Sequence, residues 1–552
     1  MSEFTPEEAE LIRPFFTNLD KPVFGLINMP EAVKGALFSR YSRSTKSLRR
    51  TLLDDFLKDT KSGFNEIVGD QVARGTQISE AIKKAEDFYT RVLDGYGDDS
   101  VAELGGAHLA IENISNLATK KLQDSRLTSP LEKSSRYVFF HHKENGDYRY
   151  FKDPMIMQSE FNEEYVSLMR LLFGTYEKLI EPLTAFAKKK LPIDDFKFFD
   201  PILKREITLQ EVSEERKKVF ETAYNAAVRA LACDNLRYLL PAATLTNTGI
   251  FANGRSWEYL IRKAYSDDLS EMPALAKVMH EELNQIIPSF IKRAKKDEYL
   301  FETRVDFDKH VREKFKEHKV KRVSDVELIF YDKNAEDKIL STILYPHTRL
   351  PLSQILKMAK KMLPEEKAAI FARYVGNRKS RRDKPGRAFE NVGYTFDVLT
   401  DFGAYRDIQR HRILTQQRED LTTTHGFEVP ELFIEAGFDK EFRKCMKKAN
   451  ELYQKIYMKH PKEAQYVVPF AYKIRWYMTM NLREAFHFVE LRSIKQGHPS
   501  YRKIAQRCYE LISKVHPSLA AHMNFVDMND YSLARIDSEV KTQQKRADRG
   551  EL

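Results

Sequence analysis

An internal repeat is the feature that most constrains this chain, because it predicts two copies of one structural element within 552 residues. Residues 107–111 alternate between apolar and polar side chains, and residues 392–398 do the same. This alternation is typical of a half-buried strand. A short helical stretch follows each strand, and Ser115 suits the N-cap of the first one. The two helical stretches lead into two related segments, residues 124–136 and residues 410–422.

A second pair of matching segments lies downstream of the first pair. Residues 253–264 read NGRSWEYLIRKA and residues 481–492 read NLREAFHFVELR. The first pair of segments is separated by 286 residues and this pair by 228, so the first half holds 58 extra residues between them. We place this insertion at about residues 143–215, with an amphipathic helix over Tyr165–Lys188.

The same pattern predicts the fold class and the domain organisation. We expect a helix-rich α+β protein made of two tandem homologous domains, at residues 1–300 and 325–552. Charged residues accumulate between 295 and 325, which favours a helical connector. The polar stretch Lys541–Arg549 is expected to fray, and Tyr137–Phe140 is expected to form a strand.

Composition and charge narrow the class of protein. A net charge of +10 and a pI near 9.0 suit an anionic ligand such as a nucleotide, and charge alone leaves nucleic acid open. The mean hydropathy is −0.53 and no apolar run reaches about 18 residues, which predicts no membrane partner. The start of the chain lacks the features of a signal peptide. Cys233, Cys445 and Cys508 lack metal-ligand spacing, so we expect a cytoplasmic location and no metal.

Taken together, the two segments 124–136 and 410–422 resemble the signature of the flavin-dependent thymidylate synthases, R-H-R-x-x-S-x-N-E-x-S-x-R. The second segment keeps the leading triplet, and the first keeps the trailing part. In that family the two parts come from neighbouring subunits. The resemblance therefore implies one composite site per chain, with these residues retained: Arg410, His411 and Arg412 from the second half; Glu132, Ser134 and Arg136 from the first.

The resemblance also implies which residues hold the flavin. Arginine forks suit phosphate and flavin carbonyl oxygens because they stay charged and donate two hydrogen bonds. The flavin-contacting histidine that the family has before the strand is missing from both halves. The positions matched to the FAD site are Arg410, His411, Arg412, Asn481, Arg483, His487, Ser42, Ser100 and Glu132.

A second set of positions is matched to the deoxyuridylate (dUMP) site of the family. One departure stands out: Asp407 replaces a glutamine and is an adverse neighbour for a phosphate. The retained residues are divided between the halves, since Arg237 corresponds to Gln465 and Arg492 corresponds to Ala264. The matched positions are Glu132, Lys133, Ser134, Ser135, Arg136, Arg237, Asp407, Arg410 and Arg492.

The implied reaction is the reductive methylation of dUMP to dTMP with methylenetetrahydrofolate and NADPH, through FAD. We interpret Arg492 as the catalytic residue, because a fixed cation near the pyrimidine stabilises the negative charge that develops as the ring carbon becomes nucleophilic. The cofactors supply the hydride and carbon chemistry. None of the three cysteines lies in a motif that indicates a nucleophile.

Two alternatives to this function stay open at the level of sequence. One is a non-catalytic relative that binds a nucleotide or nucleic acid, and the other is a different flavin- and folate-dependent modification of a pyrimidine nucleotide. Because the family is tetrameric, the resemblance implies a homodimer that forms a pseudo-tetramer, with a small-molecule nucleotide favoured over nucleic acid as the ligand. The basic loop beginning at Asn377 could contact NADPH or folate, although a solvated loop is the simpler interpretation.

Overall fold

The computed structural model describes residues 3–29, 31–41, 44–58, 101–315, 318, 321 and 323–552, so Ser42 and Ser100 lie outside the described residues. The chain divides into two compact units. The first unit comprises residues 1–114, 121–133 and 246–318, and the second comprises residues 115–120, 134–245 and 319–552. The second unit thus combines part of the first half of the sequence with most of the second half. The domain limits 1–300 and 325–552 stay a prediction.

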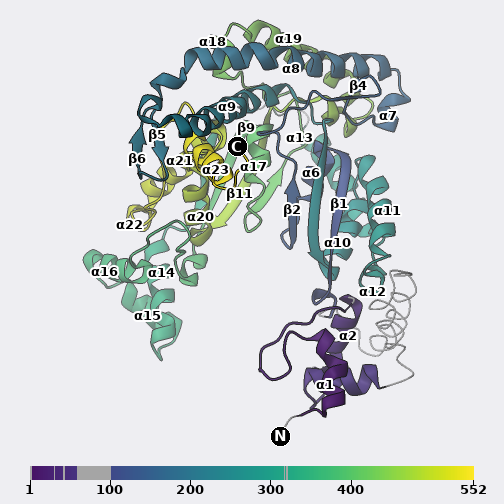
Figure 1. Cartoon of the computed structure of the whole chain (residues 1–552), viewed down its shortest axis with the longest axis vertical. Coiled ribbons are helices and arrows are strands. Elements are labelled where there is room, and N and C mark those ends of the chain that lie inside the picture. Colours follow the sequence, from purple (N-terminus) through teal and green to yellow (C-terminus); the bar gives the residue numbers. More distant parts are fainter. Residues whose placement is uncertain are drawn as a thin grey trace. The chain divides into compact units, whose positions relative to one another are not determined.

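The first unit contains a three-stranded sheet in the order β1-β7-β2 (Figure 1). Strand β2 is antiparallel to β7. The Trp257 indole on α10 is fully buried and donates to the Ala107 carbonyl on β1, at 3.1 Å, which fixes this helix against the sheet. The elements are α1 Pro6–Ile12, α2 Glu31–Tyr41, α3 Leu48–Leu52, β1 Gly106–Ser115, β2 Thr128–Glu132, β7 Leu245–Asn253, α10 Gly254–Tyr265, α11 Glu271–Leu283, α12 Pro288–Ile291 and α13 Glu298–Phe315.

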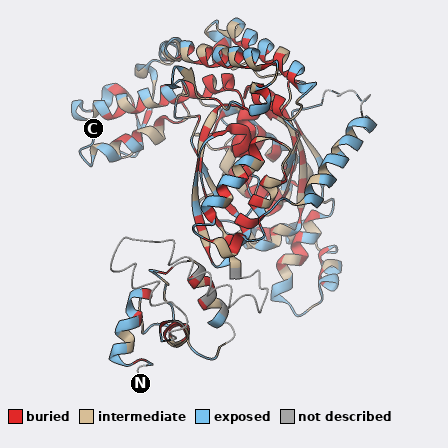
Figure 2. Ribbon diagram, turned by 90° about the vertical axis from the view of Figure 1, so that its right-hand side faces the viewer, coloured by how far each residue is buried: buried red, intermediate tan, exposed pale blue. Residues whose placement is uncertain are grey.

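The second unit is built on a four-stranded antiparallel sheet in the order β10-β11-β9-β8. In Figure 2 the buried residues gather on the inward faces of the elements, and the outer turns of the helices are exposed. The strands are β8 Val326–Tyr331, β9 Gly393–Asp401, β10 Thr415–Arg418 and β11 Lys473–Asn481, with two small hairpins, β3 Lys143–Glu144 with β4 Asp147–Tyr148 and β5 Phe198–Asp200 with β6 Arg205–Ile207.

Helices surround this sheet. The long helix α8, Asn162–Lys190, packs against α18 and α19 and confirms the amphipathic helix expected in the insertion (Figure 1). The other helices of the second unit are α7 Pro154–Met157, α9 Glu214–Leu236, α14 Ala335–Leu344, α15 Leu352–Ala359, α16 Pro364–Val375, α17 Phe402–Ile408, α18 Glu431–Glu435, α19 Asp439–Tyr457, α20 Leu482–Arg492, α21 Pro499–Val515, α22 Pro517–Ala520 and α23 Ile536–Ala547; α6, Asn116–Leu122, spans the division between the units.

The repeat appears in the order and the bounds of the elements. Strand β1 and helix α6 correspond to β9 and α17 at a separation of 286 residues, and β7 and α10 correspond to β11 and α20 at 228. The helix caps correspond as well. Ser115 and Asp401 accept from the backbone of α6 and α17, and Asn253 and Asn481 cap α10 and α20. Two tandem homologous copies of one α+β element therefore make up the chain.

Equivalent segments of the two halves pair with each other inside the second unit. Pro241 and Pro469 form an antiparallel bridge, the Ala242 N–H donates to the Val468 carbonyl, and the Phe470 N–H donates to the Leu240 carbonyl. This reciprocal pattern relates the two copies locally as a two-fold axis would. The residues just before each bridge, Arg237 and Gln465 among them, are thus placed at equivalent positions.

Two local predictions from the sequence are wrong. Tyr137–Phe140 is not a strand, since the chain makes a turn and a bend at residues 135–138 and has no regular structure at residues 139–140. The stretch from Lys541 is not frayed, since α23 packs on α9 and buries Val540 and Gln543. The helical connector is confirmed as α13. Among the described residues, no helix combines the length and the apolar character that crossing a membrane requires.

Candidate functional site

Asp407 is the centre of a cluster of arginines in the second unit, and these arginines come from both halves of the sequence. Its carboxylate accepts from Nη1 of Arg237 at 3.2 Å and lies 4.0 Å from Nη2 of Arg410. Burial raises the pKa of Asp407, but Arg237, followed by Arg136, Arg410 and Arg492, outweighs burial and holds the pKa far below its usual range. One carboxylate therefore interacts electrostatically with four guanidinium groups, of which those of Arg237 and Arg410 lie within 4.0 Å of it.

Arg237 is not satisfied by this single contact. Its side chain is almost fully buried, and its Nε and Nη2 atoms find no hydrogen-bond partner among the described residues. Both atoms lie 3.3 Å from where a Cβ on Gly403 would stand, so glycine at this position leaves room beside the guanidinium. Buried donors without a partner are costly, and their presence suits a site that an anion fills.

Arg136 has a different partner in the same unit. Its Nε and Nη2 donate to the two Asp234 oxygens at 2.8 and 2.9 Å, and its Nη1 donates to the Tyr501 hydroxyl at 3.1 Å. Arg535, just before α23, donates to the same carboxylate and to the Arg136 carbonyl. Arg136 was matched to the dUMP site from the sequence, whereas Asp234 and Arg535 were not anticipated. Neither belongs to a local motif, so no signal in the sequence could have found them.

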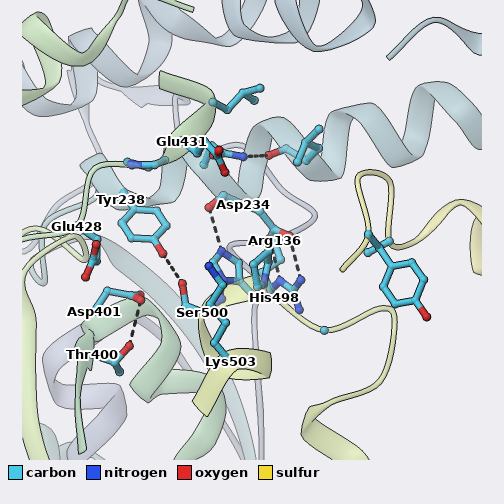
Figure 3. A pocket seen from close by; sticks show the side chains of 18 of the residues that line it. Arg136, Asp234, Tyr238, Thr400, Asp401, Glu428, Glu431, His498, Ser500 and Lys503 are labelled. Carbon is cyan, nitrogen blue, oxygen red and sulfur yellow. Dashed lines mark hydrogen bonds and ion pairs between the residues drawn. The ribbon is translucent and has the colours of Figure 1, made fainter. Parts of the chain in front are cut away.

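A cavity of about 730 Å³ opens beside this ion pair (Figure 3). Its size suits a small organic ligand. Asp401, Glu428 and Glu431 line one part of it, and Figure 3 shows Arg136, His498 and Lys503 on another. Tyr238 and Ser500 are joined inside it by a hydrogen bond of 2.8 Å. Of the residues matched to the substrate, Arg136 alone lines this cavity.

Arg492 is fixed at the end of α20 by a histidine and a tyrosine. Its Nε donates to Nε2 of His411 at 2.7 Å, and its guanidinium lies over the Tyr501 ring at 5.4 Å. His411 Nδ1 in turn lies 2.9 Å from Glu484 Oε1. Burial, followed by the charges of Arg492 and Lys384, lowers the pKa of His411 well below its usual value. The imidazole is therefore neutral, and Arg492 carries the charge at this point.

His411, Glu484 and His487 are the group of residues within the described part of the chain whose ligand atoms are close enough to hold a metal ion, all within 4.8 Å of one another. Burial, opposed by Glu484, lowers the pKa of His487 to about 4. Both imidazoles are thus neutral near pH 7, as metal ligands must be. Neither Glu484 nor a metal site was anticipated from the sequence, although Glu-x-x-His on one helix is a visible signal.

Several residues matched to the flavin already have contacts in the fold. Asn481 uses its side-chain oxygen to cap α20, and Arg483 donates to the Pro385 carbonyl and pairs with Glu390. The side chains of Arg410 and Arg412 are exposed, and Arg410 also lies 4.0 Å from Asp407. The basic loop is not simply solvated, because Arg378 forms a buried ion pair with Glu490 on α20.

The segment of residues 132–135, which begins at the last residue of β2, is divided between the two units. Glu132 and Lys133 belong to the first unit, where Glu132 accepts from the Gln123 amide at 3.4 Å. Ser134 and Ser135 belong to the second unit. There Ser135 accepts from Arg406 at 3.2 Å, and Ser134 accepts from the Arg136 backbone. Ser135 and Arg237, both from the first half, therefore each contact α17 of the second half. Ser135 binds Arg406, and Arg237 binds Asp407.

Asp234 is expected to make the protein sensitive to acid. Burial raises the pKa of Asp234, but Arg136 and Arg535 outweigh burial and hold it well below the ordinary value. Its stabilising contribution is therefore complete above the unfolded pKa of about 4 and is lost as the pH falls below that value. The free energy of unfolding of Asp234→Asn should be about 3–5 kcal/mol lower than that of the wild type at pH 7. Urea titrations should show this difference shrinking below about pH 4; a constant difference would contradict the assignment.

The comparisons with known proteins agree with the repeated architecture. The family model described as "Thymidylate synthase complementing protein" matches residues 59–289 and 327–518. A flavin-dependent thymidylate synthase of Sulfolobus acidocaldarius is 27% identical over 28% of this chain and 66% of its own length. A crystal structure of a UMP/dUMP methylase from Streptomyces cacaoi covers 36% of this chain and 94% of that chain, at 16% identity and a TM-score of 0.31.

Two relatives match nearly from end to end. The UPF0159 protein of Chlamydia muridarum is 40% identical over 97% of this chain and 98% of its own length. The UPF0159 protein of Thermoplasma acidophilum is 36% identical over 92% of this chain and 98% of its own length. With two family matches along one chain and relatives of the same double length, the protein belongs to the thymidylate synthase complementing protein family.

Proposed function

We propose that this protein is a flavin-dependent thymidylate synthase that converts dUMP to dTMP at one composite site per chain. One observation carries the proposal: Arg136 and Arg237 of the first half and Arg410 and Arg492 of the second half all act on Asp407 within one compact unit. The flavin-dependent thymidylate synthases among the distant relatives support the same reaction. A group of guanidinium groups, among them the buried Arg237 with two unpaired donor atoms, suits the phosphate of a nucleotide.

Each arginine of the proposed site has its own role in binding or catalysis. Arg237 and Arg136 bind the nucleotide phosphate, and the unpaired Nε and Nη2 of Arg237 are the first donors that it meets. Arg492 stabilises the negative charge that develops on the pyrimidine, and His411 holds its Nε. Arg410 and Arg412 face the cofactor as exposed cations. A bound flavin supplies the hydride, with NADPH as the reductant and methylenetetrahydrofolate as the carbon donor.

The cysteines favour a reaction without a thiolate nucleophile. Cys233, Cys445 and Cys508 are all buried. Burial raises the pKa of Cys233 to about 12 and raises the pKa values of the other two thiols. A thiol in this state is a poor nucleophile at neutral pH. Activation of the pyrimidine then falls to a fixed cation, which is the role proposed for Arg492.

The assay for this function follows NADPH oxidation and thymidylate formation by the purified protein, supplied with FAD and methylenetetrahydrofolate. Both signals should depend on dUMP, and calorimetry should give one dUMP site per chain. UMP and deoxycytidylate serve as alternative substrates, and methylation of either in place of dUMP would favour a different pyrimidine nucleotide modification. Nucleotide binding without any turnover would favour the non-catalytic alternative.

A further inference from the structure

Three side chains of the second unit form a continuous hydrogen-bonded chain that ends on Arg492. Glu484 Oε1 lies 2.9 Å from His411 Nδ1, and His411 Nε2 lies 2.7 Å from Arg492 Nε. Glu484 and Arg492 stand on α20, whereas His411 follows α17. His411 and Glu484 are both buried. Since α17 and α20 are separate elements of the repeat, the hydrogen bonds among Glu484, His411 and Arg492 depend on how these two elements pack.

The direction of donation along this chain is fixed by the arginine. An arginine Nε carries a hydrogen and can only donate, so His411 Nε2 must present its lone pair. In a neutral imidazole the hydrogen is then on Nδ1, which donates to the Glu484 carboxylate. Without an acceptor at Nδ1, the hydrogen would be free to move to Nε2, where it would face the Arg492 N–H. The acceptor therefore selects the tautomer that can hold Arg492.

The first half of the chain has no counterpart of His411, Glu484 or Arg492 at the equivalent positions. At the equivalent positions it has Ser125 in place of His411, Ser256 in place of Glu484 and Ala264 in place of Arg492. The copy without the cation also lacks both residues that align it. Three matched absences are expected if the residues serve one purpose, and the late helices are otherwise alike in their caps and bounds.

We propose that Glu484 is a positioning residue for Arg492, acting through His411. The carboxylate orients the imidazole and fixes its tautomer, and the imidazole fixes the plane of the guanidinium that acts on the pyrimidine. This inference rests on the proposed function, because it assigns Glu484 a part in the same site. Lys384, Arg483 and His487 are the other charged or titratable groups that act on Glu484.

The same residues could be interpreted as a metal site formed by His411, Glu484 and His487. A metal ion bound at His411 Nδ1 would need the lone pair of that atom, which would place the hydrogen on Nε2. That hydrogen would then oppose the Arg492 N–H across 2.7 Å. The contact with Arg492 thus favours the hydrogen-bonded chain over a metal ion, and metal binding becomes an outcome of the test.

The first experiment measures steady-state kinetics of two variants. Glu484→Leu removes the acceptor and should lower kcat about 10- to 100-fold, with the KM for dUMP nearly unchanged. Glu484→Gln keeps an acceptor oxygen and should retain most of the activity. The matched control is Glu258→Leu on α10, because Glu258 is as buried as Glu484 but pairs with Arg293 instead of a histidine. It should leave kcat at the wild-type value.

The second experiment is independent of turnover. Nitrogen NMR of histidine-labelled protein, with His411 assigned through His411→Gln, should show Nδ1–H and an unprotonated Nε2 in the wild type and loss of that preference in Glu484→Leu. An inactive wild type with this tautomer would refute the proposed function and leave the positioning chain intact. Wild-type kcat in folded Glu484→Leu, or Nε2–H in the wild type, would overturn the inference. Stoichiometric zinc binding that Glu484→Gln abolishes would overturn it in favour of a metal site.

Discussion

Arg492→Ala is expected to lower kcat about 1,000-fold, equivalent to about 4 kcal/mol of transition-state stabilisation. The reason is that Arg492 is the cation at the end of the chain from Glu484 and His411, and none of the buried cysteines offers another way to activate the pyrimidine. Arg492→Lys keeps the charge but loses the planar fork that His411 and Tyr501 hold, so its kcat should lie between those of alanine and wild type. The dUMP-dependent formation of thymidylate is the measurement.

The control for this prediction is Arg443→Ala. Arg443 lies on α19 with an exposed side chain, and its contact with Asp439 is a surface pair worth about 0–1 kcal/mol. This variant should turn over like the wild type. Calorimetry of dUMP separates binding from catalysis, since Arg492→Ala should bind the nucleotide with an affinity changed far less than kcat. Equal losses in binding and turnover would assign Arg492 to ground-state binding instead.

The repeated elements could be predicted from the sequence because their signals are local. The alternation of β9 and the asparagine caps of α10 and α20 lie within a few residues of the structure they specify. The side-chain partners could not be predicted in this way. Asp234 is 98 residues from Arg136, and Arg535 is 301 residues from Asp234. Pairs between residues so far apart in the sequence depend on how the helices pack. That packing cannot be predicted from the local patterns of a single sequence.

The side-chain partners of Asp407 could not be predicted either, although the sequence marked this residue as a departure from the family motif. As an isolated departure it is an adverse neighbour for a phosphate. In the structure it is the buried counter-ion of Arg237 and the nearest carboxylate to Arg410. A carboxylate in this position stabilises a cluster of arginines while no ligand is bound. The family match and the arginines thus agree with the proposed nucleotide site, where Asp407 is expected to weaken the attraction of an anion.

Asp407→Asn is accordingly expected to act in opposite directions on stability and on binding. Removing the charge leaves the buried Arg237 without the carboxylate it pairs with, so the free energy of unfolding should fall by about 3–5 kcal/mol. The same change removes repulsion against a phosphate, so the affinity for dUMP should rise about ten-fold, or about 1.4 kcal/mol. Thermal unfolding with and without dUMP measures both effects, because a ligand that binds only the folded state stabilises it by an amount that grows with the logarithm of ligand concentration over Kd.

The matched control is Asp397→Asn on β9. Asp397 also pairs with an arginine, Arg475 at 2.7 Å, but the pair is partly exposed and belongs to no arginine cluster. Its loss should cost about 0–1 kcal/mol and leave the response to dUMP unchanged. Asp407→Asn should therefore be the less stable variant without ligand and the one that dUMP stabilises more. If dUMP stabilises both variants equally, Asp407 does not lie near the bound phosphate. The phosphate would then bind elsewhere, and the cavity that Arg136 lines would be the next candidate.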